Sequence, residues 1–175
     1  MRTEFRLSGS GGQGLLLAGI VLSEAAILED KNVVQTQSYG PEARGGSSKA
    51  EVVISDSDID YPKCTDPDYL LCLTGASYNA YGPMQVNGVI IVDSSIALNP
   101  EIKAKTIAVP ILETTKDLGK MIVTNIVALG VIASLSGIVT QKTLESAVLG
   151  RVPKGTEELN LKALKAGFEL GAQVK

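Results

Sequence analysis

Glycines gather near the start of the sequence, in the stretch SGSGGQG that covers residues 8–14. Gly9, Gly11 and Gly14 have the spacing of the dinucleotide-binding fingerprint G-x-G-x-x-G, which joins a strand to a helix. Glycines let the backbone approach an anion closely, and the free amides at the start of the following helix point toward it. The stretch therefore predicts a phosphate-binding loop; the alternative is a tight strand-to-helix connection without a ligand.

Two common uses of such a loop conflict with the residues that follow it. NAD-binding proteins carry an acidic residue about 20 positions further on, whereas residues 33–39 read VVQTQSY and contain no acid. Loops of nucleotide hydrolases end in Lys followed by Ser or Thr, whereas this chain has Leu15 and Leu16. NAD binding is therefore disfavoured and nucleotide hydrolysis is effectively excluded. A diphosphate that is held and not cleaved remains.

A second glycine-rich loop, GPEARGGSS at residues 40–48, carries Arg44. A guanidinium group can bind phosphate or carboxylate through two hydrogen bonds, and the two glycines after it leave the backbone open to close approach. The loop follows a predicted strand that ends at Tyr39, so we expect it at the same sheet edge as the first loop. The alternative for Arg44 is an ion pair with Glu42 or with a neighbouring subunit.

Other side chains that could do chemistry are scarce. The sequence has no histidine, which removes the commonest general base and the commonest metal ligand. Its two cysteines, Cys64 and Cys72, match no zinc or iron-sulfur spacing, and we expect reduced thiols in a cytoplasmic protein rather than a disulfide. The stretch DSS at residues 93–95 is either a third rim of the site or a helix cap. These residues offer no evident route to catalysis by this chain alone.

The elements that must position these loops follow an α/β pattern, with 45% hydrophobic but only 4% aromatic residues. Alternating or continuous apolar runs predict strands at residues 3–7, 32–39, 49–55, 68–74, 88–95 and 105–111. Helical patterns occupy residues 15–28, 76–86, 117–137 and, on either side of 150–155, residues 140–172. Residues 1–175 are therefore expected to form one domain, an open, mostly parallel, doubly wound Rossmann-like sheet with helices on both faces.

The helix expected at residues 121–135 is apolar on nearly every side, yet it is too short to cross a membrane comfortably. Its small residues Ala128, Gly130 and Ala133 would let another helix approach closely, from this chain or from a partner. The formal net charge of −3 gives no general attraction to nucleic acid, and the N-terminus lacks the apolar run of a signal peptide. We therefore expect neither a nucleic-acid nor a membrane partner.

Several stretches together resemble the gamma subunit, or catalytic domain III, of the 2-oxoacid:ferredoxin oxidoreductases. They are GSGGQGLLLAGIVLSEAA, TQSYGPEARGGSSKAEVVIS, NIVALG and VPKGTEELNLKALKAGFELG, at residues 9–26, 36–55, 125–130 and 152–171. The resemblance covers nearly the whole chain and is strongest to the 2-oxoglutarate-specific branch. It implies membership of an enzyme that decarboxylates a 2-oxoacid oxidatively, forms an acyl-CoA and reduces ferredoxin.

The resemblance also implies how the work is divided among subunits. Thiamine diphosphate, magnesium and iron-sulfur clusters would lie in alpha, beta and iron-sulfur partner subunits, and this chain would hold no metal and no catalytic residue. It would pack against the alpha component and help to form the coenzyme A site; a homodimer of the isolated chain is left open. The residues to which the resemblance assigns that site are Gly9, Gly11, Gly12, Gln13 and Gly14, together with Tyr39 and Arg44.

Two other functions remain open at this point. The chain could be an assembly module of a pyruvate, branched-chain 2-oxoacid or indolepyruvate enzyme, whose apolar helix at residues 121–135 docks onto a partner. It could also be a stand-alone protein that binds a nucleotide or a flavin.

Overall fold

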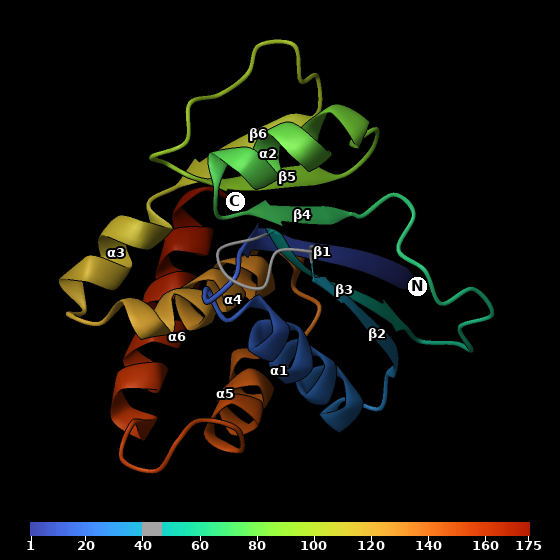
Figure 1. Ribbon diagram of the computed structural model, residues 1–175. Helices are drawn as coiled ribbons and strands as arrows, with labels where there is room; N and C mark the ends of the chain where they lie inside the picture. The colour runs from blue at the N-terminus through green and yellow to red at the C-terminus, as the bar shows by residue number, and fades with distance from the viewer. Residues whose placement is uncertain (40–46) are drawn as a thin grey trace.

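A six-stranded sheet lies at the centre of the computed structural model, which describes residues 1–39 and 47–175 (Figure 1). The strand order is β2-β3-β1-β4-β5-β6. The strands are β1 (Arg2–Ser10), β2 (Asn32–Tyr39), β3 (Ser47–Ser55), β4 (Tyr69–Cys72), β5 (Val89–Asp93) and β6 (Lys105–Val109). The α-helices are α1 (Leu15–Leu28), α2 (Gly75–Tyr81), α3 (Ile111–Asp117), α4 (Thr124–Ser136), α5 (Gln141–Leu149) and α6 (Glu157–Gln173).

Strand direction decides which loops meet at one edge of the sheet. β1 pairs in parallel with β4, β4 with β5, and β5 with β6. β3 runs antiparallel to both β1 and β2, so β2 points the same way as the parallel strands. The sheet is therefore mostly parallel, as predicted, and the carboxyl ends of β1, β2 and β4 to β6 share one edge. The alternation at residues 49–55 predicted a strand but could not give its direction.

Helices cover both faces of the sheet, which confirms the predicted fold class (Figure 1). On one face lies α2, which encloses a small core of Leu70, Cys72, Tyr78, Ile90 and Val92. On the other face lie α1, α4, α5 and α6, around the larger core to which the alternate residues Leu71 and Ile91 contribute. Because successive side chains of a strand point to opposite faces of the sheet, neighbouring residues of β4 and β5 belong to different cores.

Helix α4 is buried on every side from Thr124 to Ala133, because α6 packs closely against it and α1, α3, α5 and β4 contact it as well. A Cβ atom on Gly130 would lie 2.5 Å from the carbonyl oxygen of Leu164, and one on Gly167 would run into that of Val127. The close approach predicted from small residues is therefore made by a helix of the same chain. Residues 124–133 leave no exposed face for a partner, whereas Met121 and Ile122, just before α4, are exposed. In the described part of the chain, no helix is both long and apolar enough to cross a membrane.

The sequence prediction missed the end of one strand and the whole of one helix. β1 continues past Ser8 to Ser10, because Gly9 and Ser10 pair with Ser48 and Ser47 of β3. Helix α3 was not predicted. Its start is stabilised by the buried Asp93 carboxylate, which accepts hydrogen bonds from the Leu112 amide at 2.7 Å and the Ser95 amide at 2.9 Å. Asp93 thus caps α3, which is one of the two predicted alternatives; the other, a rim of the site, stays a prediction.

Candidate anion-binding site

The first glycine-rich loop joins the carboxyl end of β1 to the start of α1, as predicted. Gly12 and Gly14 have φ angles of 89° and 72°, in the left-handed region that favours glycine. Gly14 is the N-cap of α1, and its carbonyl accepts the first helical hydrogen bond, from the Ala18 amide at 3.0 Å. An α-helix leaves its first amides without acceptors of its own. Among the described residues the amides of residues 15–17 have no protein acceptor, which leaves them to solvent or to an anion.

Gly9 and Gln13 shape the loop from within. A Cβ atom on Gly9 would run into the Gln13 side chain and would lie 3.3 Å from Cβ of Leu73. Gln13 makes two hydrogen bonds with Ser10. Its side-chain Oε1 accepts from the Ser10 backbone amide at 2.8 Å, and its backbone amide donates to the Ser10 carbonyl oxygen at 3.3 Å. The Gln13 side chain thus closes the loop on itself, and Gly9 provides the space for it.

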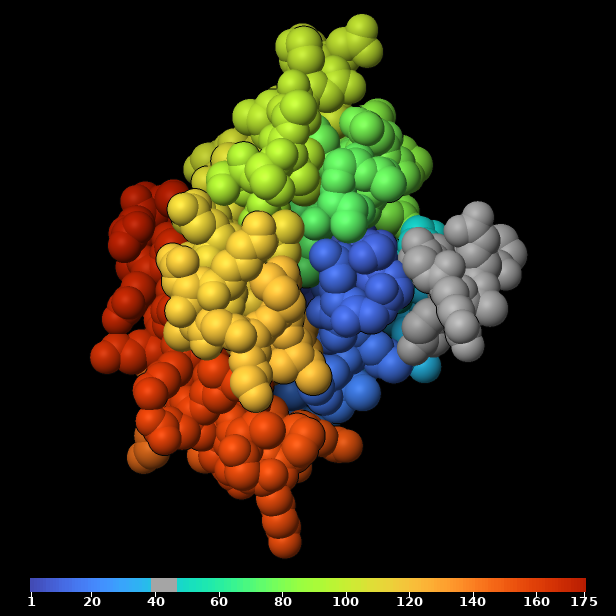
Figure 2. All heavy atoms as spheres, turned by 60° about the vertical axis from the view of Figure 1, so that its left-hand side comes forward, coloured from blue at the N-terminus to red at the C-terminus, as the bar shows by residue number. Residues whose placement is uncertain are grey.

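The outer side of the loop, at Gly11 and Gly12, is exposed. Apart from Gly12 and its two chain neighbours, no heavy atom of the described residues lies within 4 Å of a Cβ position built on Gly12. Figure 2 shows the start of the chain, in blue, reaching the surface between the green segment that contains α2 and the yellow to orange segment that precedes α4. Within the described part of the chain, the loop is therefore open on the side where the backbone of Gly11 and Gly12 lies.

Strand β2, which precedes the second loop in the sequence, ends at the same sheet edge as β1. Tyr39 pairs with Ser48, and Ser48 pairs with Gly9, so the three backbones form one row across β2, β3 and β1. This register confirms the predicted edge for the end of β2. Arg44 lies outside the described residues, as does the Tyr39 side chain, and their contribution to the site stays a prediction.

Asn125 is a site residue that the sequence analysis did not single out. It lies in the first turn of α4, is 3% exposed, and donates from Nδ2 to the Gly14 carbonyl oxygen at 3.1 Å. The two residues are 111 positions apart in the sequence. A polar residue at the start of an otherwise apolar helix was the available signal, but it does not identify the loop that the side chain contacts.

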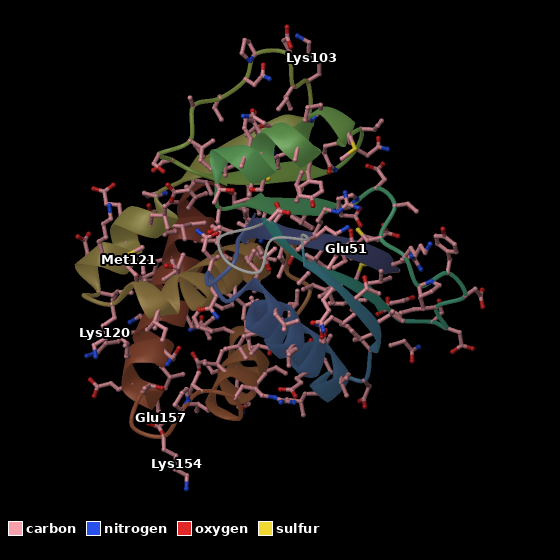
Figure 3. All side chains as sticks on the ribbon, viewed as in Figure 1. Glu51, Lys103, Lys120, Met121, Lys154 and Glu157 are labelled. Carbon is pink, nitrogen blue, oxygen red and sulfur yellow. The ribbon has the colours of Figure 1, made fainter. Side chains whose placement is uncertain are left out.

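A mostly apolar groove of about 320 Å³ adjoins the loop. It lies between the start of α1, the segment before α4 and the connection from α5 to α6, and Leu17, Ile122, Val152 and Leu159 are among its lining residues. Lys120 also lines the groove and is exposed at the surface of the molecule (Figure 3). Asn125 both lines this groove and contacts Gly14, so the groove and the loop are neighbours.

The two cysteines are free and buried, as predicted, and burial raises the pKa of Cys64 to about 12 and that of Cys72 to about 11. A neutral thiol is a poor nucleophile, so neither side chain is activated for chemistry at neutral pH. The loop itself offers backbone hydrogen-bond donors and no acid or base. The described part of this arrangement can therefore bind and orient an anion, whereas bond making would need groups from elsewhere.

Comparison with known proteins agrees with the resemblance seen in the sequence. The family model described as pyruvate ferredoxin/flavodoxin oxidoreductase matches residues 4–170. The 2-oxoglutarate synthase subunit KorC of Methanocaldococcus jannaschii is 47% identical over 99% of this chain and 96% of its own length. KorC of Archaeoglobus fulgidus is 43% identical over 97% of this chain and 88% of its own length.

Solved structures share the fold along the whole chain. The gamma subunit of a keto/oxoacid ferredoxin oxidoreductase from Geobacter sulfurreducens superposes with a TM-score of 0.89 and 46% identity, over 100% of this chain and 99% of that chain. The 2-oxoglutarate:ferredoxin oxidoreductase of Magnetococcus marinus, solved with 2-oxoglutarate, coenzyme A and succinyl-CoA bound, has the same TM-score over 99% of this chain and 32% of that chain, at 21% identity. The sequence and structural matches together show that the chain belongs to the pyruvate ferredoxin/flavodoxin oxidoreductase family.

Proposed function

We propose that this chain is the gamma subunit of a 2-oxoglutarate:ferredoxin oxidoreductase and that its first loop holds the diphosphate of coenzyme A. Four KorC relatives, 43–47% identical over nearly the full length, support the subunit type and the substrate. The Magnetococcus enzyme, which shares the fold, contains coenzyme A. The reaction is the oxidative decarboxylation of 2-oxoglutarate to succinyl-CoA with reduction of ferredoxin.

Two features of the loop together support the proposal: backbone amides that can donate to an anion, and no Lys followed by Ser or Thr of the kind that nucleotide hydrolases use. The first turn of α1 presents backbone donors beside the exposed Gly12, and Leu15 and Leu16 stand where a hydrolase has Lys and Ser or Thr. Coenzyme A must be held by its diphosphate while only its thiol reacts. A loop that binds a diphosphate and cannot cleave it meets that requirement.

The remaining chemistry belongs to partner subunits in this proposal. Alpha and beta subunits would bind thiamine diphosphate and magnesium, an iron-sulfur subunit would carry the electrons, and ferredoxin would bind the assembled complex in the cytoplasm. Residues 1–175 would act as one domain. Tyr39 and Arg44 would complete the coenzyme A site that Gly9, Gly11, Gly12, Gln13 and Gly14 begin.

A charge placed at Gly12 tests the proposal. Asp and Asn both tolerate a left-handed backbone and have nearly the same shape, so Gly12→Asp and Gly12→Asn differ mainly in charge. A carboxylate roughly 5 Å from a diphosphate would repel it by about 1–3 kcal/mol. We expect Gly12→Asp to raise the KM for coenzyme A of the holoenzyme roughly tenfold, and Gly12→Asn to change it far less.

Three further measurements make the result specific. The KM for 2-oxoglutarate should stay constant, the effect of Gly12→Asp should shrink at high ionic strength, and size-exclusion chromatography should show complete assembly. An unchanged KM for coenzyme A in an assembled Gly12→Asp complex would rule out the loop as the diphosphate site. Loss of assembly with a normal KM would favour the assembly module instead.

A further inference from the structure

We propose that Asn125 is a positioning residue, which holds the first turn of α1 in the orientation that binds the diphosphate. The inference rests on the proposed function. It assigns a role to a side chain of α4 that is 111 positions away from the loop it contacts.

One carboxamide connects the starts of two helices. Nδ2 of Asn125 donates to the Gly14 carbonyl oxygen at 3.1 Å, and Oδ1 accepts from the Ile126 amide at 3.0 Å. The Gly14 carbonyl also accepts from the Ala18 amide at 3.0 Å, so Asn125 uses the second lone pair and leaves the first helical hydrogen bond intact. The N-cap of α1 is thereby fixed to the first turn of α4.

The hydrogen bond acts on the amide that would meet the ligand. The Gly14 carbonyl and the Leu15 amide belong to one planar trans peptide unit, in which the C=O and N–H bonds point in opposite directions. A donor that holds the carbonyl therefore also sets the direction of the Leu15 N–H bond. A carbonyl that accepts strong hydrogen bonds polarises its peptide unit and makes the N–H group on the other side a better donor.

Close packing also restricts the movement of the peptide unit between Gly14 and Leu15. A Cβ atom on Gly14 would lie only 2.6 Å from Nδ2 of Asn125, so the two residues are in close contact. Asn125 is 3% exposed, and a buried side chain with two hydrogen bonds has little freedom to rotate. The peptide between Gly14 and Leu15 is therefore preorganised before a ligand arrives.

Asn160 provides a matched control within the same groove. It is also buried, at 6% exposure, and also lines the groove beside the loop. Its Nδ2 donates to the Thr156 carbonyl at 2.9 Å, at the start of its own helix α6. Removing either carboxamide deletes a buried asparagine side chain that stabilises a helix start, but only Asn125 is bonded to the loop.

The experiment compares Asn125→Ala, Asn125→Asp and Asn160→Ala in the assembled holoenzyme. We expect Asn125→Ala to raise the KM for coenzyme A about five- to tenfold, because a Leu15 amide that is no longer oriented loses about one hydrogen bond to the diphosphate. The kcat at saturating coenzyme A and the KM for 2-oxoglutarate should stay within about twofold. Asn125→Asp should raise the KM for coenzyme A further, because it removes the donor and adds a negative charge beside the anion site. Asn160→Ala should lower the Tm and leave this KM unchanged.

The outcomes separate this inference from the function it rests on. If Gly12→Asp raises the KM for coenzyme A and the Asn125 variants do not, the loop binds the diphosphate but Asn125 does not position it. If none of these variants changes the KM, the proposed function itself fails. An equal rise in Asn125→Ala and Asn160→Ala would mean a general loss of structure and would overturn the positioning role. Should Asn125→Ala not assemble, Asn125→Ser decides the question by the same KM.

Discussion

Cys72 lies in the smaller core beneath α2, with its Sγ 3.5 Å from the Ser8 hydroxyl. Cys64 is a buried residue of the loop that connects β3 to β4. At this scale burial decides reactivity, because the thiolate and not the thiol attacks an electrophile. Desolvation raises the pKa of Cys72 to about 11, so about one thiol in a thousand is ionised at pH 8.

We therefore expect the native chain to resist iodoacetamide at pH 8 and both cysteines to react once urea unfolds the protein. Mass spectrometry after timed labelling measures the rate of reaction in the native chain and in the unfolded chain. In the folded chain the rate should rise with pH up to about pH 11, beyond the ordinary pKa of 9.0, because the thiolate fraction of Cys72 is still increasing there. Rapid labelling of the native chain at pH 8 would show that the burial of these thiols does not persist in solution.

At the scale of elements, the contact between α4 and α6 depends on glycine. A methyl group on Gly167 would collide with the Val127 carbonyl, whereas one on Gly75 at the start of α2 would meet nothing within 4 Å. Gly167→Ala should lower the free energy of unfolding by about 3 kcal/mol, and Gly75→Ala should be neutral or stabilising by up to about 1 kcal/mol. Urea unfolding measures both; similar values for the two variants would mean that α6 does not pack against α4 in this way.

The elements that could be predicted from sequence are those whose pattern is local. The apolar run of α1 and the alternation of β3 gave their positions, because burial of one or more faces repeats with the period of the element. Helix α3 could not be predicted, since it has only seven residues and its start depends on Asp93, whose carboxylate bonds to Leu112 nineteen positions later. The antiparallel direction of β3 was likewise set by pairing with β1 and β2, which no local pattern reports.

The candidate site shows the same limit. Glycine spacing located the loop, and the sheet register brought Tyr39 and Gly9 into one row. The contact of Asn125 with Gly14 could not be predicted, because it arises only when α4 packs beside α1. The residues that could bind the ligand were thus visible in the sequence, while the residue that orients them was fixed by tertiary packing.

At the scale of the whole molecule, the proposed division of labour predicts how activity depends on assembly. The chain has no histidine, its thiols are buried and neutral, and its candidate site offers backbone donors. We expect no reduction of ferredoxin by the purified chain with 2-oxoglutarate and coenzyme A. The partner subunits without it should lack coenzyme A-dependent turnover, and adding it should restore that turnover until the complex is saturated.

Adding the Gly12→Asn variant to the partner subunits is the matched control, because this variant should restore the same maximal rate as the wild-type chain. Titration with Gly12→Asp should reach that rate only at higher coenzyme A concentrations, since repulsion weakens binding and leaves the catalytic groups of the partners untouched. Turnover by the chain alone would contradict the assignment of bond making to the partners. Full coenzyme A-dependent turnover by the partners without this chain would contradict its role at the coenzyme A site.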